Sequence, residues 1–200
     1  MGRPATYSTD EFVGAAVDLY ASGGARALTM SGVARAMDAA SGSIYHRFPD
    51  RPALLAAVWM HTVRAFQSGY RRALGDDPTV DDAVRAAEWI VDWCRENPSS
   101  AAVLHAGIGS FAPESWSADD RRDLEALEHE QTREMKEMAD TITRTTGLPR
   151  DQALFALFDL PLAVVRRHLT ASQAPPPRSR TMVRELTYAI LRSRTERTSR

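Results

Sequence analysis

Residues 29–48, TMSGVARAMDAASGSIYHRF, constrain the fold of this 200-residue chain more than any other stretch. Thr29 can cap a helix, because its hydroxyl can accept a hydrogen bond from a free amide of the first turn. Apolar residues then recur at i, i+3, i+4 and i+7, the spacing of one helix face: Met30, Val33, Ala34 and Met37. The sequence DAA at 38–40 breaks this pattern. We therefore predict a short helix that ends near this break.

A second short helix is predicted directly after the break. Ser41 is placed to cap it, and Ala40, Ile44 and Phe48 fall four residues apart, so that one side faces a core. Residues 39–49 contain no acidic residue, and hydroxyl, phenol, imidazole and guanidinium groups remain on the outward side. Such groups suit phosphate oxygens and base edges. The pair predicts a helix-turn-helix, whose second helix enters the DNA major groove. The alternative is a two-helix corner of an all-α protein.

Residues 40–55, ASGSIYHRFPDRPALL, resemble the TetR family of bacterial transcriptional regulators. The positions that match the family pattern are Ser41, Gly42, Ile44, Tyr45, His46, Phe48, Arg51, Leu54 and Leu55. One departure is Ala39, where the family favours Gly in the turn; a left-handed conformation at Ala costs on the order of 1 kcal/mol. The resemblance is close over residues 9–60, and beyond them it is one of helix pattern and length only.

This resemblance implies that the chain binds a double-stranded DNA operator. The residues expected to contact DNA are Thr29, Ser41, Gly42, Ser43, Tyr45, His46, Arg47 and Arg51. A preceding helix, capped by Thr9 and ended by Gly23-Gly24, should brace the motif from behind. We expect a helix-turn-helix domain at residues 1–48 and a ligand-binding and dimerisation domain at residues 49–200.

Composition restricts how the chain can bind DNA and where it can work. The net charge is −1 and the pI is about 6.5, and the N-terminal third is not basic, which argues against strong non-specific DNA binding. The single cysteine, Cys94, excludes an internal disulfide and fits a reducing cytosol. No secretory signal and no uncharged run of membrane-spanning length is present. We therefore expect a cytoplasmic bacterial protein that does not contact a membrane.

Apolar periodicity predicts an entirely helical body after residue 48. The expected helices cover approximately residues 50–74, 79–97, 99–106, 117–147, 151–172 and 179–194. Pro161 predicts a kink within the fifth of these helices, and the run APPP at 174–177 predicts a stiff linker. No strand is predicted, so the fold class is all-α in two parts.

No motif for catalysis or for a metal or other cofactor is found. His129-Glu130 begins like a zinc-protease motif, but Arg133 stands where the second histidine is required. Gly107 and Gly109 lack the third glycine of a dinucleotide fingerprint. We therefore predict that the protein is not an enzyme and needs no cofactor.

Aromatic and methionine residues on several body segments predict a cavity for a small-molecule effector, since Met repacks easily and Trp supplies broad apolar walls. The expected lining residues are Trp59, Phe66, Trp89, Trp93, His105, Phe111, Gln131, Met135, Met138 and Phe155. His105, Gln131 and His168 are the candidate polar groups. The expected effector is mainly apolar or aromatic with one or two hydrogen-bonding groups. Any one of these residues taken alone is more typical of an ordinary core than of a ligand contact.

The two last predicted helices carry more apolar side chains than one helix pair can bury. In the TetR family these helices pair with their twins as a four-helix bundle, which implies a homodimer. The interface residues expected are Phe158, Leu162, Val165, Leu186 and Leu191. The alternative is that these residues only cover the core of one chain.

Together these features predict a ligand-responsive transcriptional regulator, most simply a repressor that a small effector releases from a palindromic operator. Two alternatives stay open at this point. One is a regulator whose effector site is vestigial. The other is a helical small-molecule carrier or enzyme with an incidental helix-turn-helix.

Overall fold

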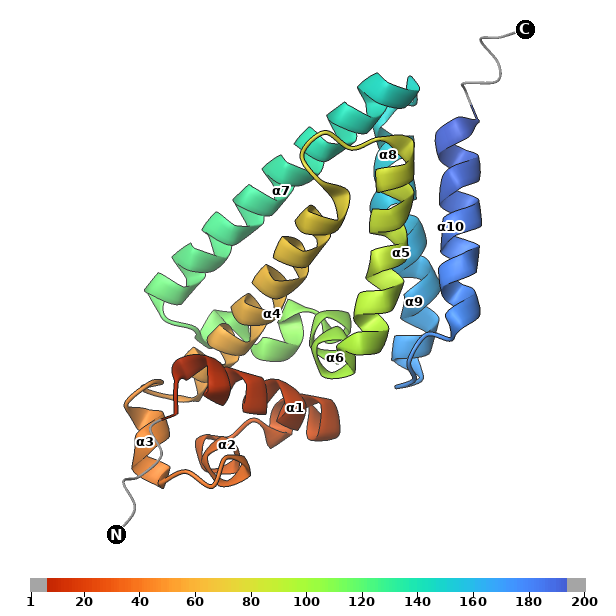
Figure 1. Cartoon of the computed structure of the whole chain (residues 1–200). Coiled ribbons are helices and arrows are strands. Elements are labelled where there is room, and N and C mark those ends of the chain that lie inside the picture. The colour runs from red at the N-terminus through yellow and green to blue at the C-terminus, as the bar shows by residue number, and fades with distance from the viewer. Residues whose placement is uncertain (1–6, 194–200) are drawn as a thin grey trace, which may run out of the picture. The chain divides into compact units, whose positions relative to one another are not determined.

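The computed structural model describes residues 7–193, and every regular element in this range is a helix (Figure 1). The predicted all-α fold is confirmed. The longer helices are α1 (Thr9–Ala27), α4 (Arg51–Leu74), α5 (Val80–Glu96), α7 (Ala118–Thr146), α9 (Leu160–Thr170) and α10 (Pro177–Arg192). The shorter ones are α2 (Met30–Ala36), α3 (Ser41–Tyr45), α6 (Pro98–Ala106) and α8 (Arg150–Leu154). None of the helices between residues 7 and 193 is long and apolar enough to cross a membrane.

The chain forms two compact units. Unit 1 comprises Met1–Arg64 and Pro98–Glu125, and unit 2 comprises Ala65–Asn97 and Ala126–Arg200. Helix α6 and the turns after it therefore belong to the same unit as the three N-terminal helices. The predicted boundary after residue 48 divides the chain by function, and it stays a prediction.

Helix α1 begins one residue earlier than predicted, because Ser8 and not Thr9 is its cap. The Ser8 hydroxyl accepts from the Glu11 amide at 3.2 Å, and the Glu11 carboxylate accepts from the Ser8 amide at 2.7 Å. This reciprocal capping box satisfies two free amides. If Thr9 were the cap, the side chain that accepts from the amide of the cap would have to come from residue 12, and Phe12 has no acceptor. The helix also continues past the predicted end, to Ala27, across a break at Gly24 (φ 63°).

The helix-turn-helix is formed by α2 and α3. The Thr29 hydroxyl accepts from the Gly32 amide at 3.0 Å, so the predicted cap is confirmed. The left-handed residue of the turn is Asp38 (φ 50°) and not Ala39, which removes the predicted strain, because Asp tolerates this conformation better than Ala. The predicted cap at Ser41 is wrong, since Ala40 holds that position and Ser41 is the first helical residue. Ala40 is exposed, in contrast to its predicted burial.

The loop after α6 completes the core of unit 1. It forms two short 3₁₀ helices, Ile108–Phe111 and Pro113–Ser115. The fully buried ring of Phe111 stacks on Tyr20 of α1, with 4.9 Å between ring centroids, and lies 5.5 Å from Trp59 of α4. The Trp116 indole N–H donates to the Phe111 carbonyl at 2.8 Å. Aromatic packing thus ties this loop to α1 and α4.

Unit 2 is built around the pair α5 and α10, which lie side by side (Figure 1). Thr79 and Asp82 form a capping box at the start of α5, which agrees with the helix start predicted at residue 79. The core of this unit draws on several helices and contains Tyr70, Leu74, Ile90, Ile142, Leu148, Leu157 and Leu191. Arg180 of α10 lies 3.4 Å from the buried carboxylate of Glu88 and 3.2 Å from Asp92, so that α5 and α10 are also joined by charge.

The predicted helix at 151–172 is interrupted, as Pro161 required. Helix α8 runs into a π-helical turn at Phe155–Asp159, and α9 follows from Leu160. The irregularity lies in the turn before the proline, where the missing N–H disturbs the hydrogen bonding of the preceding carbonyl groups. Helix α10 begins at Pro177, two residues before the expected start, with a proline in the first turn, where an N–H is not needed.

Candidate functional site

The outward side of α3 is held in place by two buried apolar anchors. Ile44 is fully buried and Phe48 nearly so. Tyr45, between them, is 56% exposed, and His46 and Arg47 are exposed as well. Ser43 is half-buried, and its hydroxyl donates to the Ala40 carbonyl at 2.6 Å. The structure therefore brings the four predicted polar side chains to one short helix and its C-terminal turn.

Two predicted DNA-contacting arginines have partners within unit 1. The Arg51 guanidinium donates to the carbonyl groups of Leu28 at 2.7 Å and Ala25 at 2.6 Å. It thus binds the carbonyl end of α1, where a cation is favourable. Arg47 donates to the Tyr7 carbonyl at 3.2 Å, and the Tyr7 ring packs edge-on against Phe12 at 5.9 Å. Sequence reasoning missed these roles, because the carbonyl partners lie 23 to 40 residues away along the chain.

The three remaining residues predicted to contact DNA are Thr29, Ser41 and Gly42. Thr29 is exposed, with its oxygen engaged as a cap. Gly42 is exposed, and a Cβ built on it would meet nothing within 4 Å. The side chain of Ser41 lies outside what the structure describes. No packing contact with residues 7–193 therefore explains why residue 42 is a glycine.

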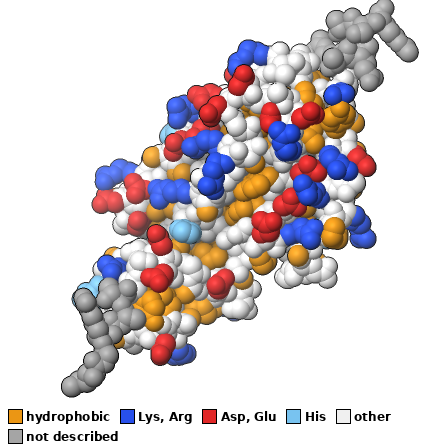
Figure 2. Space-filling model, in the orientation of Figure 1, with side chains coloured by type: hydrophobic (Ala, Val, Ile, Leu, Met, Phe, Trp, Pro, Cys, Tyr) orange, Lys and Arg blue, Asp and Glu red, His pale blue; other side chains and the backbone are white. Residues whose placement is uncertain are grey.

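Charge on the surface is mixed. Figure 2 shows Lys, Arg, Asp and Glu interleaved on the face in view, without a broad area of positive charge. This agrees with the net charge of −1. A DNA-binding surface on this chain would therefore depend on a few directed contacts more than on a general positive field.

The predicted effector residues fall in both units. Trp59, His105 and Phe111 belong to unit 1, whereas the other seven belong to unit 2. In unit 2, three rings form what we call the aromatic cluster: Phe66, Trp89 and Trp93. Phe66 lies 5.5 Å from Trp89 and 5.0 Å from Trp93, and the two indoles are 6.1 Å apart. Phe155 is 47% exposed and borders a surface groove instead.

The buried polar groups differ from those that the sequence suggested. His105 is exposed and Gln131 half-buried. Among the described residues, Gln67 Nε2 and Thr143 Oγ1 are buried atoms without a hydrogen-bond partner. Both belong to unit 2, and Gln67 directly follows Phe66 of the aromatic cluster. A buried donor without a partner is costly, so that Gln67 is a candidate contact for a bound molecule. In the sequence, the only indication of this role for Gln67 is that a polar residue lies beside the apolar side of a helix.

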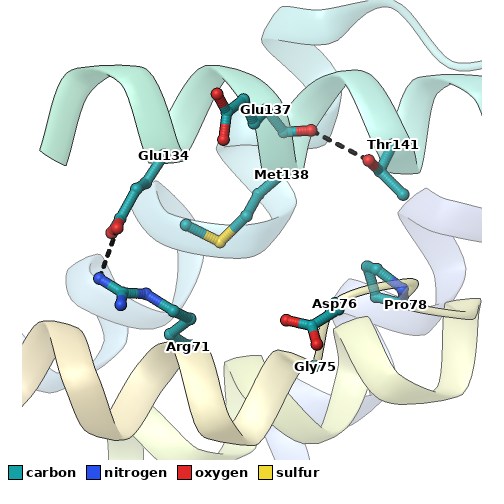
Figure 3. Close-up of a pocket in the computed structure, with 8 residues that line it drawn as sticks. All are labelled: Arg71, Gly75, Asp76, Pro78, Glu134, Glu137, Met138 and Thr141. Carbon is teal, nitrogen blue, oxygen red and sulfur yellow. Dashed lines mark hydrogen bonds and ion pairs between the residues drawn. The ribbon is translucent and has the colours of Figure 1, made fainter. Parts of the chain in front are cut away.

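A cavity of about 200 Å³ in unit 2 lies between the end of α4 and α7 (Figure 3). Arg71 forms an ion pair with Glu134 across it, and the Met138 side chain points into it. Asp76 and Glu137 add two further carboxylates to the lining. Met138 thus lines a charged cavity and not the apolar one predicted. Within residues 7–193, no three His, Cys, Asp or Glu side chains are arranged to hold a metal ion.

Three of the predicted interface residues are covered by their own chain. Phe158, Val165 and Leu191 are buried, so they cannot provide free surface to a partner. In contrast, Leu162 is 38% and Leu186 is 44% exposed. We call these two residues, with Phe155, the apolar face. Phe155 and Leu186 line an open groove of about 690 Å³, together with Ala189 and Ile190.

Comparison with known proteins agrees with the fold and the motif. The family model for bacterial regulatory proteins of the tetR family matches residues 12–58. No curated protein matches the chain in sequence.

Three solved structures illustrate the likeness of the whole fold. The TetR family transcriptional regulator PfmR from Thermus thermophilus is 18% identical, with 90% of this chain and 97% of that chain covered and a TM-score of 0.66. The fatty acid degradation regulator FadR from Bacillus halodurans is 15% identical, with 96% of this chain and 97% of that chain covered and a TM-score of 0.71. A regulatory protein of the tetR family from Rhodococcus is 19% identical, with 93% of this chain and 97% of that chain covered and a TM-score of 0.68. At such low identity these structures establish the fold alone. The helix-turn-helix at α2 and α3 lies inside the residues matched by the family model, so the N-terminal part of the chain is similar to the DNA-binding part of tetR-family proteins, which supports a DNA-binding transcriptional regulator.

Proposed function

We propose that this regulator is a repressor that binds a palindromic operator as a homodimer and leaves it when a small apolar effector binds. The observation that carries the proposal is the outward side of α3. It presents Ser43, Tyr45 and His46 without a neighbouring acid, on a helix anchored by two buried apolar residues. This role is regulatory and not catalytic.

We assign different tasks to the residues of the motif. The Tyr45 phenol suits a phosphate oxygen, whereas Ser43 and His46 suit base edges. Gly42 lets the backbone of α3 approach the DNA closely, which fits a glycine that no contact with the described part of the chain requires. Thr29 and Arg51 act mainly by holding α1, α2 and the start of α4 in place.

The apolar face supports the homodimer. Leu162, Leu186 and Phe155 are large apolar side chains that stay exposed, and Phe155 and Leu186 line the same groove, so that a partner surface could cover them. A two-fold contact between two such faces would cover all three residues in both copies. Two α3 helices could then meet major grooves about 34 Å apart, the spacing that a palindromic operator requires.

The aromatic cluster and Gln67 support an effector that is mainly apolar with one hydrogen-bonding group. Two of the similar structures are named as regulators of fatty acid degradation and fatty acid metabolism, which favours the same chemical class. For induction, the effector must bind the DNA-incompetent state more tightly; a coupling of about 1–3 kcal/mol would weaken operator binding roughly 5- to 150-fold. A DNA-bound regulator with one buried free cysteine, Cys94, fits the cytoplasm.

Selection of bound duplexes from a random pool tests the DNA-binding part of the proposal. We expect enrichment of a palindrome whose half-sites lie one helical turn apart. A pool without any enriched sequence would contradict it.

The effector part is tested with the selected duplex. Tryptophan fluorescence is titrated with a panel of fatty acids, aromatic acids, sugars and polyanions, and operator release is measured in parallel. We expect only apolar members to do both. Release by sugars or polyanions alone would refute the apolar effector, and no release by any member would favour a vestigial site.

A further inference from the structure

The π-helical turn at Phe155–Asp159 leaves two carbonyl groups without their usual backbone partners. The Leu160 amide donates to the Phe155 carbonyl, five residues back, and is therefore not available to the Ala156 carbonyl. The next position is Pro161, which has no N–H to offer either Ala156 or Leu157. Buried carbonyl groups of this kind need another donor.

Side chains from two other helices supply these donors. The Tyr70 hydroxyl of α4 donates to the Leu157 carbonyl at 3.2 Å. The Thr187 hydroxyl of α10 donates to the Ala156 carbonyl at 3.4 Å. All four residues are buried, so that water does not compete for these bonds. Both distances exceed the usual O–H···O range, and each bond should therefore be weak enough to break without unfolding the unit.

The environment of Tyr70 keeps its hydroxyl a donor. Burial raises the pKa of Tyr70, so the phenol is protonated near neutral pH and can donate. Its ring contacts Phe158 of the π-helical turn, with 4.9 Å between centroids. It also lies 6.3 Å from Phe66 and 6.2 Å from Trp89 of the aromatic cluster. Tyr70 thus touches both the cluster and the interrupted helix.

The π-helical turn also determines which side chains reach the surface. Ala156, Leu157 and Phe158 are all buried, although three consecutive residues of an α-helix spread over about 200° of its circumference. The widened turn allows all three to face the core. Phe155 and Leu162, on either side, remain exposed. Conversion to a regular α-helix would rotate the residues before and after the turn relative to each other by about 100°.

We propose that the Tyr70 hydroxyl replaces the amide that Pro161 lacks, and that this bond positions the apolar face for a second copy of the chain. Tyr70 is therefore a positioning residue, which joins α4 and the aromatic cluster to the self-association surface within unit 2. The second half of the proposal depends on the homodimer proposed above, whereas the first half does not.

A double-mutant cycle of Tyr70→Phe and Pro161→Ala tests the replacement. Amide hydrogen exchange of residues 155–165 is the readout, and Tyr20→Phe is the control, because it removes a hydroxyl from a buried tyrosine of unit 1, outside the unit that contains the turn. Tyr70→Phe should raise exchange in this segment at least fivefold in the natural background, and the control should not. In the Pro161→Ala background a backbone N–H can occupy the Leu157 carbonyl, so the effect of Tyr70→Phe should nearly disappear. Equal effects in both backgrounds would overturn the replacement.

Sedimentation of the same variants tests the second half. We expect Tyr70→Phe to weaken self-association at least threefold and Tyr20→Phe, in unit 1, to leave it unchanged. Faster exchange with unaltered self-association would overturn the positioning role. A natural chain that is monomeric at all concentrations would instead refute the homodimer, while the exchange cycle would still decide whether Tyr70 replaces the amide.

Discussion

The protein exposes a large aromatic ring at each of two surfaces, and the surroundings of the two rings differ. Tyr45 on α3 is 56% exposed and stands beside His46 and Arg47. Phe155 in the π-helical turn is 47% exposed and shares a groove with Leu186 and Ile190. A phenol among polar side chains suits phosphate and base edges, whereas a phenyl ring in a groove that combines aliphatic side chains with Asp151 and Asp159 suits another protein surface. Similar exposure therefore does not imply a similar partner.

The two surfaces also differ in how they are supported. The side of α3 that faces the core depends on Ile44 and Phe48, which lie within the same short segment. Phe155 and Leu162 of the apolar face lie on either side of an interruption in their helix, and hydrogen bonds from α4 and α10 reach the carbonyl groups that this interruption frees. We therefore expect the DNA-binding surface to respond mainly to local substitutions and the apolar face to distant ones. The following predictions test this difference.

Leu186→Glu should have the largest effect, on self-association. A carboxylate in an apolar two-fold contact is buried without a partner in each copy, which costs about 3–5 kcal/mol or more, or at least a 100-fold weaker dimer. The mass by light scattering at micromolar concentration should fall to that of one chain. Arg184→Glu, exposed on the same helix but outside the groove, is the control and should stay dimeric. Dimeric Leu186→Glu protein would place the interface elsewhere.

Tyr45→Ala should have an intermediate effect, on DNA binding. Loss of a hydrogen bond to a phosphate costs about 1.5–3 kcal/mol, so operator affinity should fall about tenfold or more. The loss should be similar for all operator variants, because a phosphate contact carries no sequence information. Ser43→Ala should instead change which sequences are preferred. Self-association should stay unaltered in both variants, and unaltered operator affinity in Tyr45→Ala would contradict the assignment of α3.

Glu11→Gln should have the smallest effect, on the stability of α1. The Ser8 amide and hydroxyl lower the pKa of Glu11 from its ordinary value. A lowered folded-state pKa contributes stability above the unfolded-state pKa, and this contribution is lost as the pH falls through the folded-state pKa. The Tm of Glu11→Gln should therefore lie slightly below that of the natural chain near pH 7, and the difference should vanish in acid. A difference that grows in acid would contradict the capping role, and both surfaces should stay intact.

Most helix starts could be predicted from the sequence, because their determinants lie within three residues of each other. The caps at Thr29, Asp50, Thr79 and Ser117 each accept from an amide three residues on. The same rule fits Ser8 and Thr9 equally well at first sight, and Glu11 decides between them. The helix-turn-helix and its outward polar side followed from the same short-range pattern.

The sequence by itself therefore determined the helices, the DNA-binding motif and the irregularity at Pro161. Only the tertiary structure decided that Leu191 is buried and Leu186 exposed, since an apolar stripe does not state which part of it meets its own core. It likewise decided that Arg51 binds the end of α1, and that Tyr70 reaches the Leu157 carbonyl 87 residues away. Short-range hydrogen bonds can be predicted from neighbouring residues, because both partners lie within a few positions of each other. The partner of a buried carbonyl group instead depends on which helices the fold brings together.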